Sequence, residues 1–414
     1  MNYEGTREKR GIRYLRLPSL WEVSIVILLF YAFFFQYGVT TINSAMLALN
    51  ALCILIGVWK LLTGVCRGKH SFYHWLIAFV LVSVLLSIVF GVSSSASIDV
   101  GIRMIEYCLT GFSVLLFSLS HKDRYLKILF FTWLSILLLA IAVQINGTIV
   151  VYLGAVGIGD LNTNEMSSFF LLMVFCAFYL YGNTNNKFQK IIIWLSLALV
   201  FFIEIQSASR RGFIVMVFMI VMNIIISVVP FNNQNSSRKR LLIYSLIAIV
   251  GAIAFIELRD YILGSTILGE RLTGSMVGGD AARTRYHQFA LEQFRQHPIF
   301  GVGVGGINYL QGVYSHSLFY ETLGCTGVVG ALLLLISFFI PLKKLLKKLF
   351  DGSNKDGYEK NNVYLNKILL IYLVAILISG VAVVMIYDFY FYLSLALIAA
   401  GMLLVNESSK VKLQ

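Results

Sequence analysis

Four arginines in two separate segments have the side-chain type that binds phosphate groups. Arg210 and Arg211 stand next to each other, and Arg283 and Arg285 lie in a polar stretch further along the chain. Each guanidinium group is planar and can bind two oxygens of a phosphate at once. Two or more arginines facing one ligand favour a pyrophosphate, because their charge persists while a bond to the pyrophosphate breaks. The alternative is that these long side chains only reach the phosphates of surrounding lipids.

His316, in the sequence Tyr-Ser-His-Ser-Leu, is the first candidate for a general base. An imidazole can take a proton from a hydroxyl group near neutral pH. His287, one helical turn after Arg283, is the main rival, and a single histidine at a membrane surface is also often an anchor. Glu321 follows His316 by five residues and stands in an apolar stretch, where an acid is a functional candidate. It would orient His316, contact substrate hydroxyls or lie at the depth of the lipid headgroups.

A glycine-rich run follows the tripeptide Pro-Ile-Phe and contains Gly301, Gly303, Gly305 and Gly306. Residues without a side chain let the backbone come close to a ligand or to another helix. No strand–turn–helix unit surrounds the run, so it is not a nucleotide-binding signature. We therefore expect Gly301 and Gly303 to support the site.

An almost entirely apolar chain must position these residues. Of its 414 residues, 58% are hydrophobic and 13% are charged, against roughly 25% charged in an ordinary soluble domain. Runs of about 20 apolar residues recur, and such runs span a bilayer as helices because backbone groups cannot stay unpaired in lipid. The sequence predicts an all-α polytopic membrane protein of about 12 transmembrane helices. The expected spans are 21–38, 41–59, 74–92, 101–119, 126–145, 165–182, 190–206, 212–229, 241–257, 316–340, 366–386 and 388–405.

The basic residues predict which side of the membrane each loop occupies. With the N-terminus inside, 25 of the 33 Lys and Arg residues fall on the inner side, and those left outside are all arginine. This bias favours cytoplasmic ends for the chain. Because the net charge of +13 sits mostly in short loops, it does not indicate nucleic-acid binding. The five cysteines are scattered without metal-ligand spacing, so no metal site is expected.

We expect three parts along the chain. Residues 1–257 would form transmembrane helices 1–9, residues 258–315 one large outer loop, and residues 316–414 helices 10–12. Within the loop, Asp280 can cap a helix that ends before Pro298.

These motifs resemble those of the O-antigen ligase and O-antigen (capsular polysaccharide) polymerase family. The family's Ser-Arg-Gly-like step appears as Ser209-Arg210-Arg211-Gly212, and its Pro-(Leu/Ile)-Phe-Gly-x-Gly run appears at 298–303. Its histidine followed by ten residues and a glycine appears as His316 and Gly327. The doubled arginine departs from the pattern, and Ser317 stands where asparagine is frequent in the family.

The resemblance implies a membrane glycosyltransferase with a GT-C-like fold that moves a glycan from undecaprenyl pyrophosphate to an acceptor hydroxyl. One of Arg210 and Arg211, with Arg283 or Arg285, would bind the pyrophosphate, and His316 would activate the acceptor. The displacement is expected to invert the anomeric carbon and to need neither metal nor cofactor. The site would face the periplasm or exterior of a bacterial cytoplasmic membrane.

Several activities remain open. Polymerisation of surface polysaccharide repeat units is slightly favoured over ligation of the glycan to lipid A core, and transfer to protein is a third acceptor choice. A transporter or flippase of lipid-linked oligosaccharide is the alternative of another class, although no inverted repeat is visible. The expected partners are a lipid-linked oligosaccharide, an acceptor glycan and membrane lipids, with a chain-length regulator protein as a further candidate.

Overall fold

The computed structural model describes residues 19–35, 43–63, 71–120, 122–146, 163–207, 209–228, 281–350 and 357–410. Every regular element in these ranges is helical. In chain order they are α1 (Leu20–Phe30), η1 (Tyr31–Phe35), α2 (Asn43–Leu62), α3 (Tyr73–Phe90), α4 (Ser94–Leu119), α5 (Lys122–Asn146), α6 (Thr163–Asn183), α7 (Lys187–Ser207), α8 (Arg210–Val228), α11 (Ala281–Gln296), α12 (Gly306–Gln311), α13 (Leu318–Phe350), α14 (Gly357–Gly380) and α15 (Phe389–Lys410).

Among the described helices, seven are long and apolar enough to cross a membrane: α3, α4, α5, α6, α7, α13 and α14. Three shorter apolar segments cover Leu20–Phe33, Met46–Leu62 and Phe389–Val405. The helical, membrane-spanning class predicted from the sequence is therefore confirmed. The expected span at 241–257 and the first part of the expected outer loop, 258–280, lie outside the described residues.

Four helix boundaries differ from the expected spans by six residues or more. α13 ends at Phe350 rather than 340 and α14 begins at Gly357 rather than 366, and the other two differences have local reasons. α4 begins at Ser94 rather than near 101, because the Ser93 side chain accepts a hydrogen bond from the Ala96 amide at 3.3 Å and caps the helix. α14 ends at Gly380, whereas the eleventh span was expected to reach 386. Residues 381–388 are not helical. Because the sequence after Gly380 remains apolar, it gives no sign of this break.

The centre of the bundle is formed by α6 and α15. Every residue of α6 from 166 to 179 is buried, as is every residue of α15 from 389 to 402. A helix that is apolar and buried on all sides belongs to a protein core. By contrast, α3, α7 and α13 expose large apolar side chains such as Leu85, Leu195 and Phe339. Exposed apolar faces of this kind are expected to meet lipid.

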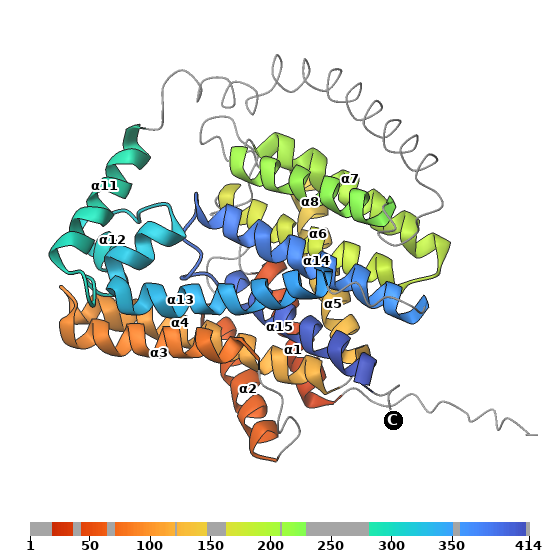
Figure 1. Cartoon of the computed structure of the whole chain (residues 1–414), viewed down its shortest axis with the longest axis horizontal. Helices are drawn as coiled ribbons and strands as arrows, with labels where there is room; N and C mark the ends of the chain where they lie inside the picture. Colours follow the sequence, from red (N-terminus) through yellow and green to blue (C-terminus); the bar gives the residue numbers. More distant parts are fainter. Residues whose placement is uncertain are drawn as a thin grey trace, which may run out of the picture.

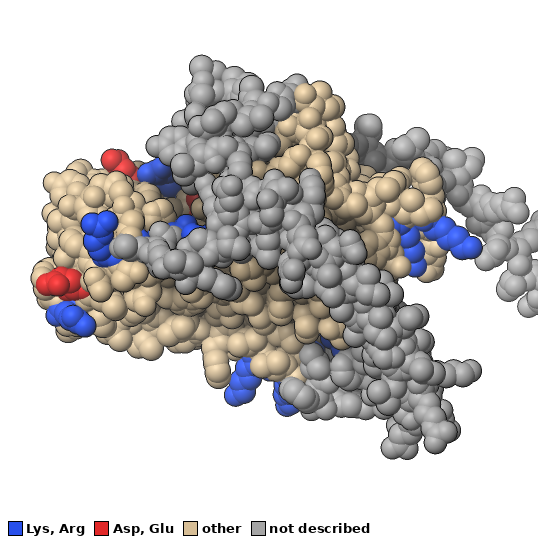
Figure 2. Space-filling model, turned by 90° about the horizontal axis from the view of Figure 1, so that it is seen from above, with Lys and Arg blue, Asp and Glu red and all other residues tan. Residues whose placement is uncertain are grey.

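Figure 1 shows α3, α4 and α13 running side by side along the long axis, with α11 and α12 at one end of the bundle. We call this end the α11 end. On the face seen in Figure 2, both acidic and basic side chains lie at the left, where α11 is, and only basic ones are visible at the right. On this face, the α11 end thus carries charges of both signs.

Candidate active site

The glycine-rich run forms a loop that packs against α13. Four backbone hydrogen bonds join them: Val302 N–H to Gly324 O at 2.9 Å, Gly303 N–H to Cys325 O at 2.8 Å, Val328 N–H to Pro298 O at 2.9 Å, and Val329 N–H to Ile299 O at 3.3 Å. These bonds are possible because α13 opens at Gly327, which has φ 59° and ψ −160°. A β-carbon on Gly327 or on Gly301 would collide with the backbone of the opposite segment. Gly327, which is separated from His316 by ten residues, is therefore the point where the helix makes room for the loop.

The other side of this loop packs against α3 and α4. Val92 N–H donates to Val302 O at 2.9 Å, and Val304 N–H donates to the Ser87 hydroxyl at 2.8 Å. Gly303 faces the backbone of Gly91 so closely that a β-carbon would lie 3.0 Å from its Cα. Of the two roles open to the glycines, approach to a helix is the one that the structure shows. Gly301 and Gly303 fix the loop that precedes the histidine.

His316 lies in a tight turn at the start of α13. Its φ of 59° makes it the one non-glycine residue with a positive φ in the described part of the chain. A residue other than glycine in this conformation costs about 1–3 kcal/mol and persists only where its surroundings hold it. The neighbouring residues do so: Ser315 N–H donates to Glu321 Oε2 at 2.8 Å, and the Ser317 hydroxyl donates to Gly380 O at 3.4 Å.

Glu321 joins this turn to two other segments. Its buried carboxylate accepts hydrogen bonds from the Tyr387 hydroxyl at 3.2 Å and from the Cys325 thiol at 3.4 Å, in addition to the one from Ser315. The Tyr387 hydroxyl in turn accepts from Gly305 N–H at 3.2 Å. Glu321 therefore links the histidine turn, the glycine loop and the connection before α15, which is the geometry of a positioning group.

The helix α11 lies over the histidine turn. The Tyr286 ring is 5.5 Å from the His316 ring, and the His287 ring stacks on Tyr320 at 4.4 Å. Below them, Ala290 packs in a small apolar cluster with Ile307 and other residues of the loop and α13. Both candidate histidines thus lie at the same end of the bundle, but only His316 has the strained backbone.

Arg211 and Arg210 are both half-buried at the start of α8. The Arg211 guanidinium points to the start of α6, where it donates to the Ser168 hydroxyl at 3.1 and 3.2 Å and also to the Asn164 carbonyl. Gly212 allows this packing, because a β-carbon there would collide with the hydroxyl of Ser167 and the carboxylate of Glu204. Those two groups are themselves hydrogen bonded at 2.6 Å.

The two arginine segments lie near enough for their charges to interact. The charges that act on Arg211 include those of Glu204, Asp388 and Arg283. Arg283 lies one turn before Tyr286 on α11, so the two side chains share a face of that helix. Through this face, α11 reaches both Arg211 and His316. Arg285 is exposed on α11.

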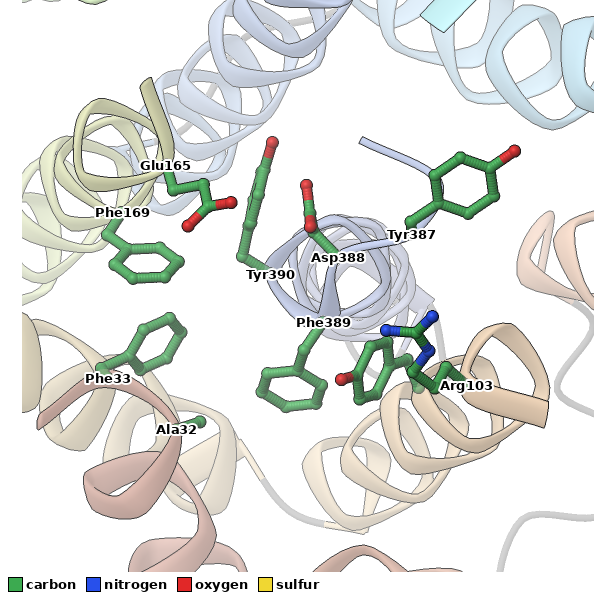
Figure 3. Close-up of a pocket in the computed structure, with 10 residues that line it drawn as sticks. Ala32, Phe33, Arg103, Glu165, Phe169, Tyr387, Asp388, Phe389 and Tyr390 are labelled. Atoms are coloured by element: carbon green, nitrogen blue, oxygen red, sulfur yellow. The ribbon is translucent and has the colours of Figure 1, made fainter. Parts of the chain in front are cut away.

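A pocket of about 160 Å³ lies beside Arg211 and was not predicted as a site from the sequence. It is lined by Ala32, Phe33, Arg103, Tyr107, Glu165, Phe169, Tyr387, Asp388, Phe389 and Tyr390 (Figure 3). Burial raises the pKa of the Asp388 carboxyl, the Glu165 carboxyl raises it further, and Arg211 acts in the opposite direction. Arg103, Glu165 and Asp388 come from three distant segments, and each alone also fits an ordinary ion pair or headgroup contact.

No group of three or more His, Cys, Asp or Glu side chains able to hold a metal ion occurs within the described residues. The polar groups at the α11 end are instead arginines, a histidine, tyrosines and pairs of carboxylates. This set can bind an anion, exchange a proton with a hydroxyl and accept hydrogen bonds from a polyhydroxylated ligand.

Fold and site together define a helical integral membrane protein with arginines and a histidine of strained backbone at one end of its bundle. Residues 193–335 match the family model described as O-antigen ligase. The matched segment is about a third of the chain and includes all four candidate arginines and His316, so the likeness to this family lies in the part that carries the candidate site. This family indicates an enzyme of glycosyltransferase type that acts in a bacterial membrane in surface polysaccharide synthesis. No curated protein matches the chain.

Proposed function

We propose that this protein transfers a glycan from undecaprenyl pyrophosphate to a sugar hydroxyl and so polymerises repeat units of a surface polysaccharide. The observation that carries the proposal is the position of α11, whose Arg283 acts on Arg211 while its Tyr286 packs on His316. These two effects of one helix support a shared site for the arginines and the candidate base. A pyrophosphate leaving group and an acceptor hydroxyl are the two groups that such a pair serves.

In the proposed reaction, the acceptor oxygen attacks the anomeric carbon of the donor sugar. The bond between that carbon and the pyrophosphate oxygen breaks, and its electron pair leaves with the pyrophosphate. His316 takes the proton of the acceptor hydroxyl, and Arg211 and Arg283 offset the charge on the leaving group. The products are the lengthened glycan and undecaprenyl pyrophosphate. Attack from the face opposite the leaving group inverts the anomeric carbon, and the arginines supply the positive charge without a metal ion.

The proposed setting is a GT-C-like arrangement of about 12 spans with both termini in the cytoplasm and the α11 end on the outer side. The distribution of Lys and Arg supports this orientation. Undecaprenyl chains and other lipids would contact the exposed apolar faces of the bundle. A chain-length regulator remains a candidate partner.

Ligation of the glycan to lipid A core is the second candidate, because the matching family model is described as O-antigen ligase. The two activities share the donor, the arginines and the base, and they differ only in the acceptor. Sequence and geometry at the α11 end serve both, so an acceptor experiment separates them.

The test is a reconstitution with purified protein and a lipid-pyrophosphate-linked oligosaccharide, with products resolved by size. A ladder of lengthening lipid-linked chains, absent in Arg211→Ala and His316→Ala proteins, is the expected result. Transfer only after lipid A core is added identifies a ligase. If no glycan is transferred while labelled lipid crosses the bilayer, the enzyme proposal is wrong and the chain is a transporter.

A further inference from the structure

The pocket beside Arg211 has an aromatic wall assembled from four helical segments. The Phe33 ring lies 5.1 Å from Phe169 and 6.4 Å from Phe389, and the Tyr107 ring lies 5.9 Å from Phe389. These rings come from η1, α6, α15 and α4. Aromatic rings give a rigid surface for the C–H face of a ring-shaped ligand while polar groups beside them fix its orientation.

The polar groups of the pocket face one another across this space. Figure 3 shows the Tyr390 ring between the carboxyl groups of Glu165 and Asp388. The Tyr390 side chain is 6% exposed, and within the described residues its hydroxyl has no hydrogen-bond partner inside 3.5 Å. The neighbouring Ser168 hydroxyl already donates to Asn164 and accepts from Arg211. A buried hydroxyl in this state calls for a further partner, which a ligand in the pocket would supply.

The charges around the pocket select the kind of ligand. Glu165 and Asp388 contribute negative charge, and Arg103 and Arg211 lie near enough to balance it. A neutral molecule with several hydroxyl groups fits this set better than an anion or a cation. At about 160 Å³ the pocket is smaller than the roughly 300–1,000 Å³ that hold drug-sized ligands, so it suits one ring.

The pocket adjoins both parts of the candidate active site. Asp388 acts on Arg211, which we place at the pyrophosphate. On the other side, the Tyr387 ring lies 5.0 Å from Tyr314, two residues before His316, and its hydroxyl bonds to Glu321. A ring held here lies next to the arginines and within one layer of side chains from the histidine turn.

We propose that this pocket binds the first sugar of the donor, the one attached to pyrophosphate, with Asp388, Glu165 and Tyr390 as its hydrogen-bonding groups. The inference rests on the proposed function, and it means that the protein recognises the donor sugar as well as its diphosphate. Sugar hydroxyls donate to the carboxylates, the Tyr390 hydroxyl pairs with a sugar oxygen, and the aromatic wall covers one face of the ring.

The test compares two ligands in proteins that carry His316→Ala to suppress turnover. Affinity is measured for the lipid-pyrophosphate-linked oligosaccharide and for undecaprenyl pyrophosphate without sugar. The proposal predicts tighter binding of the sugar-bearing lipid. Asp388→Asn should reduce that preference about tenfold, the usual scale of one lost hydrogen bond to a charged group, while affinity for undecaprenyl pyrophosphate stays the same. Asp99→Asn, which alters an exposed carboxylate on the neighbouring helix α4, should keep the preference.

Tyr390→Phe removes one oxygen and keeps the ring. It tests the pocket separately if Asp388→Asn weakens binding of both lipids through misfolding. A reduced preference for the sugar-bearing lipid in Tyr390→Phe supports the pocket. An unchanged preference in Tyr390→Phe, or in an Asp388→Asn protein that binds undecaprenyl pyrophosphate normally, overturns it and leaves the proposed glycan transfer standing. Failure of the parent protein to bind either lipid contradicts the proposed function itself.

Discussion

Two pockets lined by described residues differ in size and in the chemistry of their walls. The larger of the two, of about 810 Å³, lies among α1, α5, α6 and α7 and is lined mostly by apolar side chains. Its charged residues are Glu22, Asp123 and Lys127, and Lys127 Nζ forms an ion pair with Glu22 Oε1 at 2.5 Å. The pocket of about 160 Å³ at the α11 end instead holds two carboxylates, an arginine and a buried tyrosine hydroxyl. The chemistry of the lining, rather than the volume, therefore distinguishes the candidate site from the larger pocket.

The largest effect is expected from Arg211→Ala at the α11 end. Removing a preorganised group that stabilises developing charge typically lowers a rate by about 100- to 1,000-fold, and we expect glycan transfer to fall by that order. Arg124→Ala is the matched control. Arg124, which lies on α5, also donates a hydrogen bond to a serine hydroxyl, that of Ser120 at 2.6 Å. The measurement is the initial rate of glycan transfer. Equal losses in the two variants would show that an arginine at the α11 end contributes no more to transfer than one on α5.

Glu321→Gln tests whether a carboxylate at the α11 end positions the His316 turn. A neutral amide cannot accept from Ser315, Tyr387 and Cys325 together as the carboxylate does. Because Glu321 positions the His316 turn, we expect kcat to fall about tenfold with little change in KM. Glu292→Gln, on the exposed face of α11, should leave both constants unchanged. An increase in KM alone would assign Glu321 to substrate binding.

Two glycines that both have a positive φ, but that differ in ψ (−160° at Gly327 and −1° at Gly312), test how the glycine loop is held. Gly327 and Gly312 have φ of 59° and 76°, but a β-carbon at Gly327 meets the backbone of Ile299 whereas one at Gly312 meets nothing within 4 Å. Gly312→Ala should cost about 1–2 kcal/mol from its backbone conformation alone. Gly327→Ala should lower the thermal unfolding midpoint clearly further. Equal midpoints would show that the loop does not depend on close packing at the kink.

The smallest effect is expected at the large pocket. Glu22→Gln removes the ion pair with Lys127, whose side chain is 54% exposed, and an ion pair of this kind contributes about 0–1 kcal/mol. Glycan transfer should stay within about twofold of the parent protein, since ordinary surface changes alter stability little. A loss of transfer comparable to that in Arg211→Ala would give the large pocket a role in the reaction.

The sequence predicts the helices and the main polar residues because each leaves a local signal. Apolar runs mark the spans, and Arg211, Arg283 and His316 stand out as polar residues on the predicted outer side. The role of Gly327 depends on a loop almost thirty residues away, so its spacing from His316 indicates the motif but not the kink. The small pocket leaves no local signal, since Phe33, Arg103, Glu165 and Asp388 meet only when four segments pack together.

The most direct test of the central claim compares two histidines at different helix starts. His316→Ala and His74→Ala proteins are reconstituted with the lipid-pyrophosphate-linked oligosaccharide, and the rate of glycan transfer is measured. His74 is an exposed residue at the beginning of α3. The account predicts that His316→Ala lowers transfer by about 100- to 10,000-fold, the range for a lost general base, and that His74→Ala leaves it unchanged. Full transfer by a correctly inserted His316→Ala protein would contradict the account.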